Sequence, residues 1–71
     1  MERIVSKGKV KEYNLDRGYG TVIDVDTGQQ LTVYANYINL KKNEILKENQ
    51  EVKYEIENHR GGDWAVNVRI L

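Results

Sequence analysis

Apolar and polar residues alternate with a period of two along several short stretches of the chain. The clearest alternation lies in residues 51–57, where charged side chains separate Val52, Tyr54 and Ile56. Because successive side chains of a strand point to opposite faces, this pattern predicts a strand with one buried face. The same period predicts a last strand over residues 64–71, with Val66, Val68 and Ile70 turned inward and Asn67 and Arg69 turned outward.

Three more strands are predicted in the first half of the chain. Residues 7–13 alternate around Val10, and the period slips before Tyr13, as it does where a strand carries a β-bulge. Residues 19–25 and 30–34 are rich in β-forming side chains. The Asp-Thr-Gly turn between these two segments predicts a hairpin.

Residues 35–49 follow neither the strand period nor a clean helical period. We expect a short helical turn and then an irregular connection, whose apolar side chains line a helical face or fold back onto the core. These side chains are Tyr37, Ile38, Leu40, Ile45 and Leu46. Five short strands with one long connection after the third predict an all-β fold, a five-stranded antiparallel barrel.

Length and composition indicate a single small domain over residues 1–71. Of its 71 residues, 39% are hydrophobic and 31% charged, which is ordinary for a globular chain. Such a chain has one small core and a stability of roughly a few kcal/mol. No signal-peptide pattern and no membrane-spanning run is present, so we expect a cytoplasmic protein with no membrane partner.

Metal binding and catalysis find little support in the sequence. The chain has no cysteine and one histidine, His59, so we expect no metal site and no cofactor. Asp24 and Asp26 are the one notable carboxylate pair, and we place both at the surface edge of a hairpin rather than in a cleft. We therefore expect that the protein is not an enzyme.

The most informative stretch is Gly18-Tyr19-Gly20. A glycine on each side leaves little bulk beside the ring, so Tyr19 on an open strand face could meet a flat partner such as a nucleic-acid base. The alternative is that the barrel needs these glycines in order to bend. Eleven basic and eleven acidic residues cancel, so bulk charge gives no general attraction to nucleic acid.

Three motifs in this order suggest a family. They are Gly8-Lys9-Val10-Lys11 with Asn14 and Arg17-Gly18-Tyr19-Gly20-Thr21-Val22, then Leu31-Thr32-Val33-Tyr34-Ala35, and finally Ala65-Val66-Asn67-Val68. From about Ser6 to Arg69 the chain resembles the bacterial cold-shock domain. The resemblance implies an OB-fold barrel that binds single-stranded RNA or DNA by stacking bases on aromatic side chains.

The chain departs from the family pattern at several stacking positions. Glu12 stands where the family has Trp, and Thr21, Thr32, Ala35 and Asn43 stand where it has Phe. Each stacked base contributes about 1 to 3 kcal/mol, so these losses together lower affinity by about three orders of magnitude or more. The resemblance therefore implies binding that is weak and of low sequence specificity.

The resemblance and the residue types together give a set of candidate binding residues. Lys9, Lys11 and Arg17 are expected to contact phosphates, and Trp64 is either a relocated stacking platform or a lid over the core rim. Tyr37 and Tyr54 are assigned to packing. The full set predicted to bind nucleic acid is Lys9, Lys11, Tyr13, Asn14, Arg17, Tyr19, Tyr34, Arg60 and Trp64.

A second hypothesis belongs to another functional class. A diverged barrel that has lost its nucleic-acid face would act as a protein-interaction or regulatory module, with a protein partner or as a homodimer. Three observations favour this hypothesis: several of the family's aromatic side chains are replaced, the net charge is zero, and three apolar side chains look exposed in the sequence. These side chains are Trp64, Tyr37 and Leu40.

Overall fold

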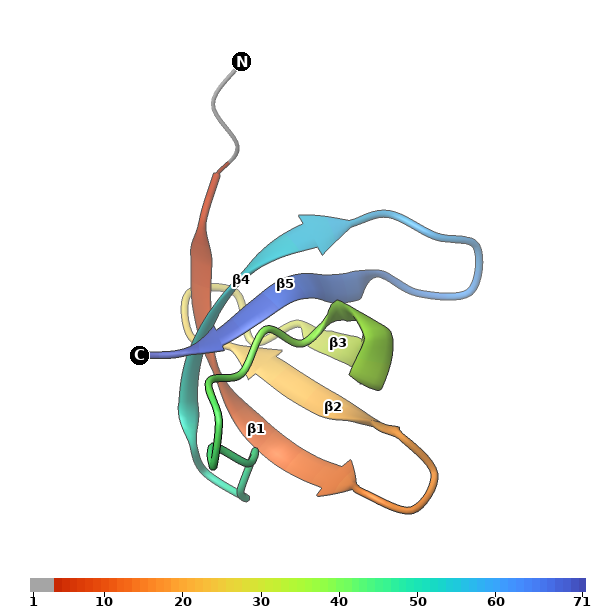
Figure 1. Cartoon of the computed structure of the whole chain (residues 1–71). Coiled ribbons are helices and arrows are strands. Elements are labelled where there is room, and N and C mark those ends of the chain that lie inside the picture. The colour runs from red at the N-terminus through yellow and green to blue at the C-terminus, as the bar shows by residue number, and fades with distance from the viewer. Residues whose placement is uncertain (1–3) are drawn as a thin grey trace.

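The computed structural model describes residues 4–71, which form a closed five-stranded barrel (Figure 1). Around the barrel the strands follow the order β1-β2-β3-β5-β4. The predicted all-β OB-type barrel is confirmed. Residues 1–3, which belong to the N-terminal stretch without a signal-peptide pattern, lie outside the described residues. The strands are β1 Ser6–Asn14, β2 Tyr19–Asp24, β3 Gln30–Tyr34, β4 Glu51–Glu57 and β5 Trp64–Ile70.

A parallel strand pair closes the barrel. Thr32 and Val33 of β3 lie opposite Trp64 and Ala65 of β5, whereas the other neighbouring strands run antiparallel. Closure pairs the strand edges of this small sheet, which would otherwise be open to other chains. It also places the start of β5 beside the outer surface of β3.

The predicted bulge in β1 is confirmed. The pairing of β1 with β2 shifts between Val10 and Glu12, which leaves Lys11 as the extra residue. A bulge bends a strand and increases its twist. Such a bend suits β1, whose first residues pair with β4 while most of its length pairs with β2.

The two glycines around Tyr19 serve the backbone. Gly18 has φ +74° in the β1–β2 turn, a conformation that side chains disfavour. Gly20 points inward, and a Cβ there would lie 2.3 Å from the backbone oxygen of Glu12. The interpretation that the barrel requires these glycines therefore explains both, without a ligand beside Tyr19.

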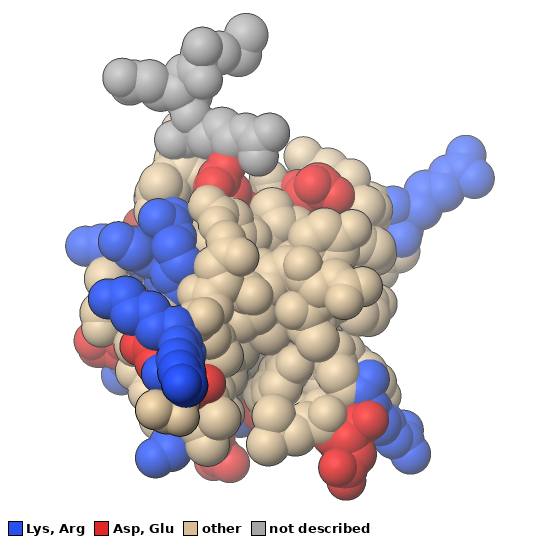
Figure 2. Space-filling model, in the orientation of Figure 1, with Lys and Arg blue, Asp and Glu red and all other residues tan. Residues whose placement is uncertain are grey.

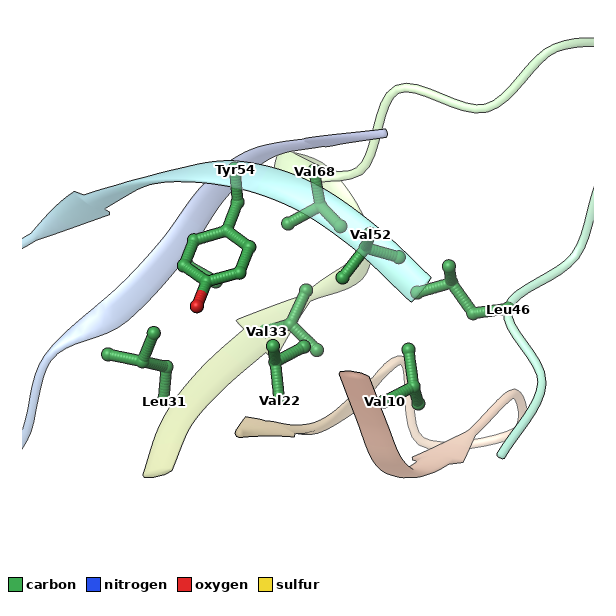
Figure 3. Packing of buried hydrophobic residues seen from close by; sticks show 9 residues of the cluster. Val10, Val22, Leu31, Val33, Leu46, Val52, Tyr54 and Val68 are labelled. Carbon is green, nitrogen blue, oxygen red and sulfur yellow. The ribbon is translucent and has the colours of Figure 1, made fainter. Parts of the chain in front are cut away.

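The core is built from all five strands and from one side chain of the long connection (Figure 3). The connection begins with the short helix η1, Ala35–Tyr37, and continues irregularly, as predicted. Tyr54 is fully buried, which confirms its assignment to packing. The buried cluster is Val10, Val22, Leu31, Val33, Leu46, Val52, Tyr54, Ala65 and Val68.

One detail of the predicted inward faces is wrong and another is incomplete. In β5, Val66 is buried as predicted at 6% exposure, but its neighbour Ala65 is buried too, because Asn67 has φ +53° and the register with β4 shifts nearby, which breaks the alternation. In β4, Ile56 is 38% exposed. Pairing with β1 starts at Tyr54 opposite Ser6, so Ile56 lies beyond the part of β4 that β1 covers.

The prediction of a surface position for Asp24 is also wrong, whereas Asp26 is exposed. Asp24 is 3% exposed, and its Oδ2 accepts a 2.6 Å hydrogen bond from the hydroxyl of Tyr54. Its Oδ1 accepts the backbone N–H groups of Asp26 and Thr27 at 2.9 and 3.0 Å. The Tyr54 hydrogen bond lowers the pKa of Asp24, against the opposing effect of burial, so this carboxylate links the β2–β3 turn to the core.

Candidate nucleic-acid interface

Many of the predicted site residues lie on the outer surface of β1, β2, β3 and β5. Outward side chains of paired strands stand beside one another, so the strand register arranges them in rows. Two adjacent rows of outward side chains cross this surface, which is the binding face that the family resemblance implies. The first row is Asn14, Tyr19 and Tyr34, and the second is Glu12, Thr21, Thr32 and Trp64.

Aromatic rings form a continuous series across this surface. The ring centroids of Tyr19 and Tyr34 are 6.3 Å apart, and those of Tyr34 and Trp64 are 4.7 Å apart. Trp64 also contacts Tyr37 at 5.7 Å and His59 at 3.6 Å. These separations are typical of interacting aromatic pairs. We call the last four residues, Tyr34, Tyr37, His59 and Trp64, the aromatic edge.

The β1–β2 end of the surface combines Tyr19 with a cation. Tyr19 is 42% exposed and lines a groove together with Arg17, Asn14 and Glu12. The backbone N–H of Arg17 donates to Asn14 Oδ1 at 3.0 Å, so the predicted binding residue Asn14 fixes the turn that carries Arg17. An exposed ring beside a guanidinium suits a base and its phosphate.

The middle of the surface carries no rings. Glu12 lies opposite Thr21, and Thr21 lies opposite Thr32, so the second row is polar until it reaches Trp64. Glu12 adds an exposed carboxylate to it. Stacking at this position is therefore lost, as the departures from the family pattern imply.

The predicted lysines are separated from Tyr19. Lys9 lies opposite Ile23, four residues along β2 from Tyr19, which corresponds to about 13 Å of strand. Lys9 and Lys11 line a different groove, with Val25 and Gly28. The structure thus puts Arg17 in the same groove as Tyr19, whereas both lysines line a groove that does not include Tyr19.

Two other predicted residues lie away from the rows. Tyr13 is half-buried and packs against the core, so its ring is largely structural. Arg60 is exposed in the β4–β5 loop and follows His59 in sequence. Basic side chains lie mostly around the rim in Figure 2, and the centre of that view, over β5 and η1, is largely uncharged.

Two members of the aromatic edge differ from the sequence interpretation. Tyr37, assigned to packing, is 39% exposed and contacts Trp64. The sequence assigns no binding role to His59, but its ring stacks on Trp64 with an interplanar angle of 17°. Leu40, one motive for the protein-interaction hypothesis, packs against the core. No sequence signal links these residues to Trp64, because tertiary pairing brings the segments together.

Within residues 4–71, no helix has the length and apolar character needed to cross a bilayer. The same residues contain no group of three or more histidine, aspartate or glutamate side chains arranged to hold a metal ion.

Known proteins are similar to this chain in sequence and in fold. Residues 6–71 match the family described as 'Cold-shock' DNA-binding domain. The cold shock-like protein CspA of Rickettsia typhi is 35% identical over 63 residues, covering 89% of this chain and 90% of that protein. The cold shock protein CspB of Bacillus caldolyticus is 38% identical over 64 residues, covering 90% of this chain and 96% of that protein.

A solved structure agrees on the fold. The structure titled drosophila Unr CSD456 superposes with a TM-score of 0.76 at 16% identity, covering 97% of this chain and 27% of that longer one. At 16% identity this superposition shows only that the fold is the same. The family is shown by the sequence matches. The chain belongs to the cold-shock domain family.

Proposed function

We propose that this protein binds single-stranded RNA or DNA with low affinity and little sequence preference, and that it does not act as an enzyme. The observation that carries the proposal is the continuous series of rings from Tyr19 through Tyr34 to Trp64, with Arg17 at one end. Every base has a flat face, so stacking on such rings tolerates any sequence.

Low affinity follows from the composition of the same surface. Glu12, Thr21 and Thr32 offer no stacking in the second row, and Glu12 repels phosphates. Among residues 4–71, Arg17 is the one basic side chain lining the groove at Tyr19, so few phosphates are neutralised there and few counterions are released on binding. A protein of this kind would melt RNA hairpins only by mass action, because it stabilises the unpaired strand in proportion to its concentration.

Titration of the ¹⁵N-labelled protein with a pyrimidine-rich heptamer tests the proposal. We expect saturable amide shifts at Arg17, Tyr19 and Tyr34, and no comparable shifts with a blunt duplex of the same sequence. Replacing Tyr19 with Leu should weaken binding about fivefold to 100-fold, the range for one stacked base. Val25→Ala is the control, since Val25 is 63% exposed and belongs to the hairpin at the other end of β2.

The titration also separates the two functional classes. No saturable shift at millimolar heptamer would refute nucleic-acid binding. In that case, recovery of a stoichiometric protein partner from nuclease-treated lysate, lost on substitution of Trp64, would favour the protein-interaction module. Equal losses for Tyr19→Leu and Val25→Ala would show that binding does not use the ring series.

A further inference from the structure

The rings of the outer surface are concentrated at one side. The aromatic edge holds four of the five rings in the series, and it lies where the parallel pair of β3 and β5 closes the barrel. The first part of the second row has none. If bases stack on this protein, as the proposed function holds, the rings that can receive them lie mainly over β3, η1 and β5.

Trp64 is the centre of the aromatic edge. Its indole meets Tyr34 edge-on at an interplanar angle of 60° and Tyr37 at 52°. These two tyrosines therefore flank the indole and do not lie flat upon it. The ring that does lie flat on Trp64 is His59, at 3.6 Å and 17°.

The His59 ring has the position that a stacked base would take. It is a flat nitrogen heterocycle at stacking distance, and its Nε2 lies 2.6 Å from Glu57 Oε1. The side chain remains 29% exposed. Its loop contains Gly61 and Gly62, both at positive φ, and is held by a hydrogen bond from Gly62 N–H to the His59 oxygen at 3.3 Å and by hydrogen bonds of the Asn58 side chain and the His59 backbone to the Asp63 carboxylate. His59 lies outside β4 and β5, so turning its side chain away from Trp64 breaks no strand pairing.

The charges around Trp64 favour a base over a phosphate. Glu57 and Asp63 are close to it in the β4–β5 hairpin, and Asp63 Oδ2 accepts a 2.8 Å hydrogen bond from Gln29 Nε2. Hydrogen bonds from Asn58 and Gln29 lower the pKa of Asp63, which keeps the carboxylate charged. Two carboxylates repel a phosphate but not an uncharged base.

We propose that the aromatic edge is the principal stacking site of this protein, and that His59 occupies the base position on Trp64 until an unpaired base displaces it. The site takes an unpaired nucleobase of single-stranded RNA or DNA, with the phosphates turned away from Glu57 and Asp63. The inference rests on the proposed function and assigns Tyr37 and His59 to it.

Fluorescence of Trp64, the single tryptophan, reports on this site directly. With a pyrimidine heptamer we expect saturable quenching. His59→Ala should tighten binding about threefold to tenfold, because the base no longer competes with a stacked ring. Tyr37→Leu should weaken binding at least about fivefold. Val25→Ala, in the hairpin at the far end of β2, is the control and should leave affinity unchanged, and thermal unfolding checks that each variant is folded.

The outcomes distinguish this inference from the proposed function. Absence of any saturable signal, in fluorescence and in amide shifts, would overturn both. Saturable shifts at Tyr19 and Arg17 with unchanged Trp64 fluorescence would leave nucleic-acid binding intact and overturn the aromatic edge as its stacking site. If His59→Ala binds the heptamer more weakly than wild type, the proposal that a base displaces His59 is wrong. The imidazole would then be part of the surface on which bases stack.

Discussion

At the residue scale, the Asp24–Tyr54 pair shows how a charged group is held inside a small barrel. Asp24 accepts hydrogen bonds from the Tyr54 hydroxyl and from two backbone N–H groups of the turn. Burial and the hydrogen bond to Asp24 raise the pKa of Tyr54, so the hydroxyl remains a donor at neutral pH. The pair is therefore a structural feature that depends on the ionised state of Asp24.

Replacing Tyr54 with Phe should lower the free energy of unfolding by about 2 kcal/mol at pH 7, the contribution of a hydrogen bond to a charged group. The pKa of Asp24 is lower in the folded state, so its stabilisation is present above the unfolded pKa and is lost as pH falls through the folded pKa. The difference between wild type and variant should therefore shrink below about pH 4. Urea unfolding at pH 7 and at pH 3 checks this, with Tyr37→Phe as the control for loss of an exposed hydroxyl. An equal difference at both pH values would contradict the prediction.

Gly20 and Gly28 are needed for different reasons, the first for the close approach of another strand and the second for its backbone conformation. A Cβ on Gly20 would lie 2.3 Å from the Glu12 oxygen and 2.7 Å from the Tyr13 Cα, both backbone atoms, so β1 must move. Gly20→Ala should cost about 3 kcal/mol. Gly28 has φ +75° with open space around it, so Gly28→Ala should cost only about 1 kcal/mol of backbone strain. Denaturant unfolding of the two variants gives the comparison, and equal losses would show that the close approach of β1 is not decisive.

At the element scale, the register of β1, β4 and β5 places like charges side by side. Lys7 lies opposite Lys53, and Lys53 lies opposite Arg69, so three cations form a row across three neighbouring strands. Figure 2 shows basic side chains gathered on the left of the view, where β4 and the C-terminus lie. Like charges directly opposite each other destabilise a sheet.

Reversing the middle charge of this row should stabilise the protein. Lys53→Glu turns two repulsive pairs into attractive ones and should raise the free energy of unfolding by about 1 kcal/mol. Salt screens the row, so wild type should gain stability between about 0.05 and 1 M NaCl and the variant should gain less. Lys42→Glu makes the same change in net charge at an exposed turn position and should have little effect. If both variants gain the same free energy of unfolding, the effect comes from net charge and not from the row of cations.

At the scale of the whole molecule, the barrel depends on a side chain that no strand supplies. Leu46 is 5% exposed and joins the core from the long connection. That connection is tied to β5 by a bridge between Ile38 and Val68 and by the Asn39 N–H, which donates to the Val68 oxygen at 2.7 Å. The irregular segment thus completes the core, and a chain of this size is only marginally stable.

Leu46→Ala should lower the free energy of unfolding by about 2 to 5 kcal/mol, the cost of removing a buried leucine side chain. For a barrel of this size that loss is comparable to its total stability, so much of the variant should be unfolded at 37 °C. Ile45→Ala is the control, because Ile45 is 49% exposed and its truncation should change stability by less than about 0.5 kcal/mol. Thermal unfolding of both variants decides whether the connection is part of the core.

The sequence by itself determined the local elements of this protein. The strands Glu51–Glu57 and Gln30–Tyr34, the bulge before Tyr13 and the short helical turn were predictable, because period and turn chemistry act between residues close in sequence. The motifs around Tyr19 and Tyr34 were also enough to indicate the family and its barrel.

Only the tertiary structure decided which of these residues meet. Asp24 is buried because Tyr54, thirty positions away, reaches it, and Trp64 joins Tyr34 because β3 and β5 pair in parallel at the barrel closure. His59 reaches Trp64 through the geometry of the β4–β5 loop. Long-range pairing depends on the closure of the whole sheet rather than on any local pattern, which is why the sequence indicated single rings and the structure joined them into one surface.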